Sequence, residues 1–204
     1  MKKGTFMNEK EWLDYFETIN NRKPTEEEIQ QAKANGGVLM IRTVRPEDAK
    51  RIAEIYSWYV ANTTITYEIT LPDEAEMLRR INKVSAQFPW LVYEEDGQVI
   101  GYAYAGKFRE REAFNVSVEL SAYFDQAYCG GGRGMEIMKA LLKELESYEL
   151  YTALACISYG NAASQKLCEK LGFELAGVTH NVGFKFGKWL SLAFYTLQLK
   201  EYKK

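Results

Sequence analysis

Apolar residues recur at helical spacing in two stretches near the middle of the chain. Between residues 52 and 60, and again between residues 77 and 84, apolar side chains fall three or four positions apart, which is typical of a helix with one buried face. A β-like run at residues 38–42 precedes the first of these helices, and Pro46 suits its first turn. This part of the chain is therefore predicted to form a strand followed by two helices.

Strand-like runs dominate the next part of the chain. Residues 90–93 and 99–104 flank Asp96-Gly97, a pair whose tolerance of positive φ suits a tight antiparallel hairpin. Residues 116–124 alternate strictly, which predicts a strand with one apolar and one polar face. The apolar face would carry Val116, Val118, Leu120, Ala122 and Phe124, and the polar face Ser117, Glu119, Ser121 and Tyr123.

A glycine cluster separates that strand from another predicted helix. Residues 130–134 read Gly-Gly-Gly-Arg-Gly, and residues 137–145 then carry apolar side chains on one side. Residues 153–157 favour a strand, residues 162–171 a helix ended by Gly172, and residues 174–199 two or more terminal strands. The expected order is thus strand, glycine loop, helix, strand, helix and terminal strands.

The N-terminal residues predict a separate helical hairpin. Trp12, Tyr15, Phe16 and Ile19 have helical spacing, and Thr25 stands three residues before Glu28 in a capping-box pattern. The second helix is expected to end near Gly36-Gly37. We therefore divide the chain into a hairpin over residues 1–37 and a main domain over residues 38–204. The aromatic stripe of the hairpin would pack on the main domain or contact a partner.

Composition excludes several classes of protein. With 204 residues, of which 47% are hydrophobic, the chain can bury the core of one domain with a small appendage. The net charge of −2 and pI near 5.7 give no basic field for nucleic acid or anionic membranes. Because no apolar run approaches the roughly 20 residues of a membrane span and no signal peptide is evident, a cytoplasmic location is expected.

The cysteines and the single histidine exclude further kinds of site. Cys129, Cys156 and Cys168 are odd in number and lack CxxC spacing, so neither a disulfide framework nor a zinc site is expected. His180 is the only histidine, which makes a Ser-His-Asp hydrolase or a multi-histidine metal site hard to build. We therefore expect free thiols and no bound metal.

The glycine loop is the first candidate for ligand binding. It lies where a helix begins, so unpaired amides and the positive end of the helix dipole would meet an anion there. The loop can equally be a plain turn. It lacks the context of a dinucleotide fingerprint, because an antiparallel hairpin precedes it, and it is not a GxxxxGK[ST] loop. An acyl-coenzyme A is then the better anion.

Several motifs in a fixed order resemble one protein superfamily. The polar-faced strand is followed by YCGGGRGMEIMKALL, a strand, and NAASQKLCEKLGF, which resemble the acetyl-CoA core of the GCN5-related N-acetyltransferase (GNAT) superfamily. The segments IRTVRPEDAKRIAEIYSWYV, PWLVYEEDGQVIGYAYAGKFRERE, VELSAYF and VGFKFGKW are similar to the phosphinothricin-type acetyltransferases. The resemblance covers about residues 40–199, and the N-terminal hairpin lies outside it.

The resemblance implies a mixed α/β (α+β) fold with a mostly antiparallel sheet flanked by helices. That sheet splays after the strand that carries Glu119, and the pantetheine arm of acetyl-CoA enters the gap. Main-chain groups at Ala122, Tyr123 and Phe124 would bind pantetheine and acetyl, while residues 129–134 would hold the pyrophosphate. Asn161 would contact the pantetheine arm, although it also suits a helix N-cap. By residue, the loop comprises Cys129, Gly130, Gly131, Gly132, Arg133 and Gly134.

The resemblance also implies the acceptor side of the site. Glu119 matches the proposed base, because an amine becomes nucleophilic only after losing its proton. Alternatively, a glutamate on a polar strand face is simply solvated. Arg109 and Arg111 would bond a carboxylate or phosphinate, or belong to a solvated charged loop. Tyr67 matches an aromatic of the acceptor pocket, or else packs in the core.

Several positions depart from the pattern of the superfamily. Cys129 replaces the usual Arg or Gln, Arg133 stands where a small or apolar residue is usual, and Cys168 replaces the Tyr or His that would protonate the thiolate. Ser191-Leu192 also stands where relatives carry Asp-Val. These changes leave the acceptor and the proton donor open.

The implied activity is transfer of acetyl from acetyl-CoA to the amine of a small amino-acid-like acceptor of the phosphinothricin or methionine sulfoximine type. No metal would take part. Two alternatives stay open: a weakly active or non-catalytic acetyl-CoA-binding module whose hairpin contacts a partner, and an enzyme that acetylates proteins. Relatives commonly form homodimers, so a homodimer is a further expectation from the resemblance.

Overall fold

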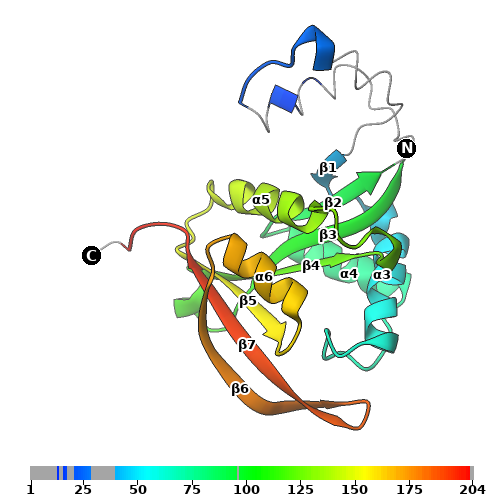
Figure 1. Ribbon diagram of the computed structural model, residues 1–204, viewed down its shortest axis with the longest axis vertical. Coiled ribbons are helices and arrows are strands. Elements are labelled where there is room, and N and C mark those ends of the chain that lie inside the picture. Colours follow the sequence, from blue (N-terminus) through cyan, green and yellow to red (C-terminus); the bar gives the residue numbers. More distant parts are fainter. Residues whose placement is uncertain (1–12, 14–15, 18–20, 29–39, 96, 203–204) are drawn as a thin grey trace.

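Seven strands form one mixed sheet in the order β1-β2-β3-β4-β5-β7-β6 in the computed structural model, which describes residues 13, 16–17, 21–28, 40–95 and 97–202 (Figure 1). Every neighbouring pair is antiparallel except β4 and β5. The strands are β1 (Met40–Thr43), β2 (Trp90–Glu95), β3 (Gln98–Lys107), β4 (Ser117–Phe124), β5 (Thr152–Ser158), β6 (Glu174–Lys185) and β7 (Lys188–Gln198). The expected mixed, mostly antiparallel fold is confirmed.

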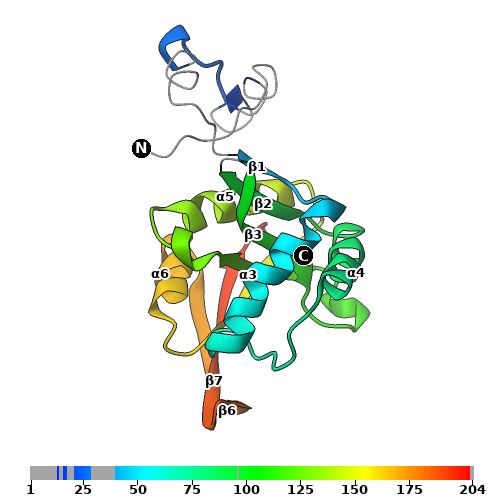
Figure 2. The ribbon, with the colours of Figure 1, turned by 90° about the vertical axis from the view of Figure 1, so that its right-hand side faces the viewer.

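Two helices cover each face of the sheet (Figure 2). On one face, α3 (Ala49–Asn62) and α4 (Glu74–Ser85) bury the apolar stripes that their sequences predicted. On the other face, α5 (Arg133–Leu145) and α6 (Ala162–Lys170) pack on the apolar side of β4. Short 3-10 helices, η1 (Pro46–Asp48), η2 (Glu112–Phe114) and η3 (Gln126–Tyr128), lie in the connections. One detail was wrong: Val116 precedes β4 and is exposed rather than buried.

The parallel strands β4 and β5 separate partway along their length. They pair from Ser117 with Thr152 to Glu119 with Leu154, and beyond this point each strand continues without the other. Divergence frees main-chain groups on the facing edges, which would otherwise hydrogen-bond across the ladder. The expected splay after the glutamate strand is therefore confirmed.

Strands β6 and β7 form a long hairpin at the edge of the sheet (Figure 1). Its turn places Phe186 and Gly187 at φ 51° and 73°, a conformation that glycine adopts readily and phenylalanine rarely. Near that turn the side chains of Phe184, Phe186 and Trp189 are 55%, 56% and 67% exposed. The hairpin thus presents aromatic surface to solvent.

The predicted N-terminal hairpin lies mostly outside the described residues, including Trp12, Tyr15, Ile19 and residues 29–37. The capping box is described: the Glu28 carboxylate accepts from the Thr25 amide at 2.8 Å, and the Glu28 amide donates to the Thr25 hydroxyl at 3.3 Å. Residues 26–28 are helical, as this cap predicts. The division at residue 37 stays a prediction. Over the described parts of the chain, no helix is long and apolar enough to cross a membrane.

Candidate active site

A cleft lies where β4 and β5 diverge. Its walls include Ala122 and Tyr123 from β4, Cys156 and Ser158 from β5, and Asn161 at the start of α6. Three of the predicted cofactor residues, Ala122, Tyr123 and Asn161, therefore line one cavity. Since the strands no longer pair here, the edge of β4 is available to an extended ligand.

The glycine loop has a backbone that only glycine adopts easily. Gly130, Gly131 and Gly132 have φ of 89°, 65° and 86°, and Gly132 is the N-cap of α5. A Cβ built on Gly130 or Gly132 would meet nothing within 4 Å, so the loop faces open space beside a helix N-terminus. This arrangement fits a pyrophosphate, because free amides and the helix dipole both favour an anion.

The two unusual residues of the loop are both engaged with the protein. The Cys129 sulfur lies 3.6 Å from the Asp125 carbonyl oxygen and 3.7 Å from the Tyr59 hydroxyl. Arg133 donates from Nη2 to the Glu95 carboxylate at 3.2 Å, and its buried Nε finds no partner among the described residues. The Arg133 guanidinium therefore lies at the loop but is anchored to Glu95.

Helix α3 holds the base of this loop through contacts that the sequence did not reveal. The Tyr59 hydroxyl donates to the Phe124 carbonyl oxygen at 2.6 Å, at the last residue of β4. Arg51 pairs with Asp125, and Asp125 caps the short helix before the loop by accepting from the Ala127 amide at 2.9 Å. The end of β4 and the start of the loop are thus fixed to α3.

Asn161 is the N-cap of α6 and also lines the cleft. Its side-chain oxygen accepts from the Ser164 amide at 3.3 Å, which is N-cap geometry, and its amide nitrogen donates to the Ser164 hydroxyl at 2.9 Å. The same residue lines the cleft. The N-cap interpretation is confirmed, and contact with a ligand stays a prediction.

Glu119 lies at the last paired position before the strands diverge. It shares the α3 and α4 side of the sheet with Ser121 and Tyr123 and is half-buried. Burial raises the pKa of the Glu119 carboxyl, an effect opposed by a hydrogen bond from Cys156 and by the charge of Arg109. A carboxylate with a raised pKa holds a proton more readily, as a general base requires.

Cys156 is the neighbour of Glu119 that sequence reasoning missed. Burial and the adjacent carboxylate raise the pKa of its thiol to about 12, so the thiol stays protonated and donates. The alternation of residues 153–157 carried the signal that Cys156 points away from the core, because Ala153, Ala155 and Ile157 face the core. Cys156 therefore had to face the other way, but only the register of β4 with β5 brings it to Glu119.

The predicted acceptor residues are distributed around this carboxylate. Arg109 follows β3 on an exposed loop, lies 4.7 Å from the Phe108 ring, and is the arginine whose charge acts on Glu119. Arg111 is exposed further along the same loop. Tyr67 donates to the Ser191 carbonyl oxygen at 2.9 Å, which ties it to β7. Of these residues, Arg109 is linked to the candidate base.

Cys168 lines the far wall of the cleft from α6. Burial raises the pKa of its thiol to about 11. An ordinary thiol has a pKa near 8.5, so Cys168 is a weaker acid than a typical thiol. It is therefore poorly suited to give a proton to a departing thiolate.

The chain is similar to known acetyltransferases in sequence and structure. Residues 41–192 match the model of the acetyltransferase (GNAT) domain. The chain is 38% identical over 152 residues to a phosphinothricin N-acetyltransferase from Alcaligenes faecalis, covering 74% of this chain and 77% of the relative. It is 37% identical over 161 residues to an L-methionine sulfoximine/L-methionine sulfone acetyltransferase from Pseudomonas aeruginosa, covering 78% and 94%. The structure of yncA from Salmonella typhimurium, with its cofactor acetyl-CoA, matches with a TM-score of 0.79 at 34% identity, covering 81% and 96%.

Proposed function

Because this chain belongs to the acetyltransferase (GNAT) family, we propose that it transfers acetyl from acetyl-CoA to the amine of a small amino-acid-like acceptor. The observation that carries the proposal is the position of Glu119, at the point where β4 and β5 part to form the cleft. A base there would meet an acceptor amine beside a thioester held in the gap. The names of the related enzymes support acceptors of the phosphinothricin or methionine sulfoximine type.

The chain's own residues supply positioning and proton removal. Glu119 takes the proton that makes an ammonium group unreactive, and the nitrogen lone pair then attacks the thioester carbonyl carbon. The C–N bond forms as the carbonyl π electrons move onto oxygen, and the C–S bond breaks when the carbonyl is restored. The nitrogen loses a second proton on becoming an amide, which balances protonation of the coenzyme A thiolate. Amides on the freed edge of β4 would hold the oxyanion.

The acetyl-CoA would lie along the edge of β4 and end at the glycine loop. We assign pantetheine and acetyl binding to main-chain groups of Ala122, Tyr123 and Phe124, with Asn161 opposite. The pyrophosphate would meet the amides of residues 129–134, whose positive φ values open the loop beside the N-terminus of α5. Because Cys168 is a weak acid, the thiolate would leave without a proton from that position.

The acceptor would lie on the α3 and α4 side of Glu119. Arg109 and Arg111 could pair with its carboxylate or phosphinate, since guanidinium groups bind such anions through two parallel hydrogen bonds. Tyr67, on the loop after α3, would form one wall of the acceptor pocket. Its hydrogen bond to Ser191 fixes the ring there. The charge of Arg109 on Glu119 supports this arrangement.

A panel of acceptors tests the proposal. Thiol release from acetyl-CoA would be measured with L-methionine sulfoximine, phosphinothricin, common amino acids, a polyamine and a peptide amine. Turnover restricted to amino-acid-like acceptors is the expected result. Saturable binding of acetyl-CoA without turnover of any acceptor would refute an enzyme and favour the binding module. Preference for the peptide would favour a protein acetyltransferase.

We also propose a homodimer in the cytoplasm. The exposed aromatic residues Phe184, Phe186 and Trp189 on the β6–β7 hairpin support self-association, because such surface is normally covered. The free thiols of Cys129, Cys156 and Cys168 suit a reducing compartment. Light scattering on the purified protein tests the dimer: a monomeric mass at all concentrations would refute it, and Trp189→Lys should lower the mass of a dimer.

A further inference from the structure

The loop between α3 and α4 reaches both parts of the candidate site. Ile65 lines the cofactor cleft, and Tyr67 contacts β7 through Ser191. The Tyr67 ring also packs so closely on Gly183 of β6 that a Cβ there would lie 2.5 Å from it. The other residues that line the cleft come from β4, β5, α5, α6 and the turn before α6, so a shift of this loop would change the proposed acceptor wall more than the cofactor cleft.

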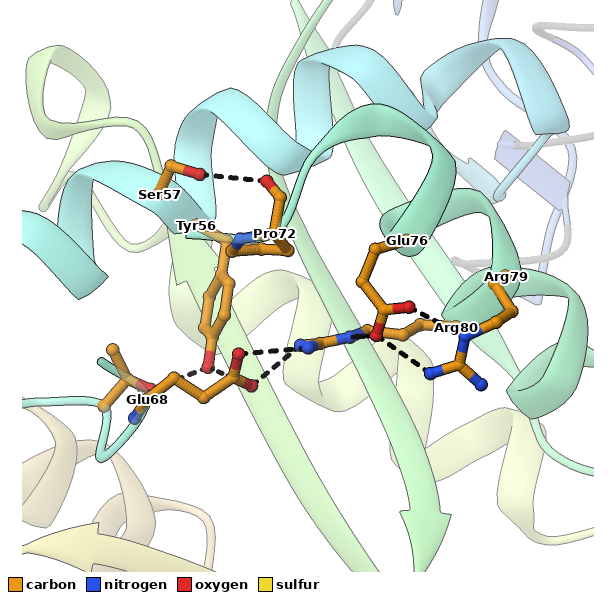
Figure 3. Close-up of polar contacts among 8 residues, drawn as sticks. Tyr56, Ser57, Glu68, Pro72, Glu76, Arg79 and Arg80 are labelled. Atoms are coloured by element: carbon orange, nitrogen blue, oxygen red, sulfur yellow. Dashed lines mark hydrogen bonds and ion pairs between the residues drawn. The ribbon is translucent and has the colours of Figure 1, made fainter. Parts of the chain in front are cut away.

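One carboxylate joins this loop to the helices on either side of it. Glu68 accepts two parallel hydrogen bonds from Arg80 of α4, at 2.7 and 3.0 Å, and one from the Tyr56 hydroxyl of α3 at 3.0 Å (Figure 3). The pairing is bidentate, which is the strongest geometry available to arginine and a carboxylate. Glu68 thus fixes the loop at its middle.

The same contacts continue to the sheet and to β6. The Tyr56 hydroxyl also bonds the Thr66 hydroxyl at 2.6 Å, and its ring packs edge-on against Tyr123 of β4 at 5.0 Å. From β6, the buried amine of Lys185 donates to the Thr66 carbonyl oxygen at 3.0 Å. The loop is therefore tied to α3, α4 and β6. Tyr56, which bonds the loop, also touches β4, one of the strands that form the cleft.

Two adjacent arginines on α4 have different partners. Arg79 and Arg80 both donate to Glu76, at 2.7 Å in each case, but the bonds to Glu68 come from Arg80 (Figure 3). The side chain of Arg79 is 63% exposed and that of Arg80 31% exposed. Substitutions at these two positions therefore separate the loop contact from the general charge of the helix.

We propose that Glu68 and Arg80 are positioning residues that hold the α3–α4 loop in the conformation that forms the acceptor wall. The pair would act through Tyr67 and Ile65 and would not touch the reacting atoms. This inference rests on the proposed acetyl transfer for its kinetic consequence, while the loop conformation itself can be measured without turnover. A specific loss for the acceptor, with the acetyl-CoA side retained, is the signature of this role.

The experiment compares Arg80→Met with Arg79→Met in the full chain. Arg80→Met should raise the acceptor KM about tenfold, because charged hydrogen bonds at a partly exposed site are worth roughly that factor. The KM for acetyl-CoA should stay within about twofold, and hydrogen–deuterium exchange in residues 63–71 should become faster. Arg79→Met should match the wild type in all three measurements. Glu68→Gln should reproduce Arg80→Met and replaces it if that variant does not fold.

Each other outcome overturns the inference. Unchanged exchange in residues 63–71 of Arg80→Met would show that the pair does not hold the loop. Faster exchange with an unchanged acceptor KM would show that the loop does not form the acceptor wall, and equal effects of both arginine variants would indicate a general effect of helix charge. If the wild type acetylates no acceptor, the proposed function fails, and the exchange comparison alone decides whether the pair orders the loop.

Discussion

Replacing Tyr59 with Phe tests whether α3 fixes the end of β4 for cofactor binding. The change removes one oxygen, which donates to the Phe124 carbonyl at 2.6 Å and lies 3.7 Å from the Cys129 sulfur. Tyr59 is buried, at 7% exposure, so water cannot easily replace its hydroxyl. Phe124 is the last residue before the turn into the glycine loop, and its carbonyl would lose the contact that holds it to the helix.

The size of the effect follows from that loss. A buried acceptor left without its donor costs about 1–3 kcal/mol, and a domain of this size loses about 2–4 °C in Tm per kcal/mol. Tyr59→Phe should therefore lower Tm by roughly 4–8 °C, taking the middle of the first range. Because the lost contact lies beside the loop that would hold the pyrophosphate, acetyl-CoA should bind at least about fivefold more weakly. That factor corresponds to about 1 kcal/mol of binding free energy.

Thermal unfolding and titration calorimetry with acetyl-CoA measure both quantities. Tyr159→Phe is the matched control, because it removes the same atom from a ring that is 56% exposed. The control should stay within about 0.5 kcal/mol of the wild type. If Tyr59→Phe matches the control in Tm, the hydroxyl contributes nothing to the fold. If Tm falls while acetyl-CoA affinity is unchanged, α3 does not position the cofactor loop.

Three further predictions concern the loop and the base. Gly130→Ala should raise the KM for acetyl-CoA, because φ is 89° and the added methyl would point into the open space proposed for the pyrophosphate. An unchanged KM would remove this loop from the cofactor site. Cys156→Ala should move the acidic limb of the pH–rate profile to higher pH, because the Cys156 hydrogen bond lowers the pKa of Glu119; an unmoved limb would refute the contact. Glu119→Gln should be more stable than the wild type at neutral pH, with the gap closing below about pH 4, because burial raises the pKa of Glu119 and its ionisation costs the folded state. Melting curves at several pH values check this last sign, and a gap that widens towards acid would contradict it.

The sequence predicted most of the elements, because these depend on local patterns, and three of the candidate cofactor residues line one cleft. The alternation of residues 116–124 placed Glu119 and Leu120 on opposite faces, and the structure confirms that Leu120 is in the core while Glu119 is on the other face. The glycine cluster permits positive φ, which the loop has. Val116 was misplaced because alternation alone does not show where a strand begins.

Contacts between distant residues could not be predicted in the same way. Tyr59 and Phe124 are 65 positions apart, and Tyr59 fits the apolar stripe of α3 whether or not its hydroxyl has a partner. The link between Cys156 and Glu119 depends on the register of two parallel strands, which period-two alternation leaves open. Glu68 and Arg80 similarly resemble ordinary surface charges in the sequence, and only the path of the α3–α4 loop brings them together.

The pH dependence of acetyl transfer by the wild type and by Glu119→Gln tests the central claim most directly. With acetyl-CoA and the best acceptor of the panel, the wild-type kcat/KM should rise with pH through a pKa higher than that of an exposed glutamate, because burial raises the pKa of Glu119. Glu119→Gln should lose a factor of about 100 or more and should lack that limb. Full activity in Glu119→Gln, or the same acidic limb in both proteins, would contradict the role of Glu119 as the base.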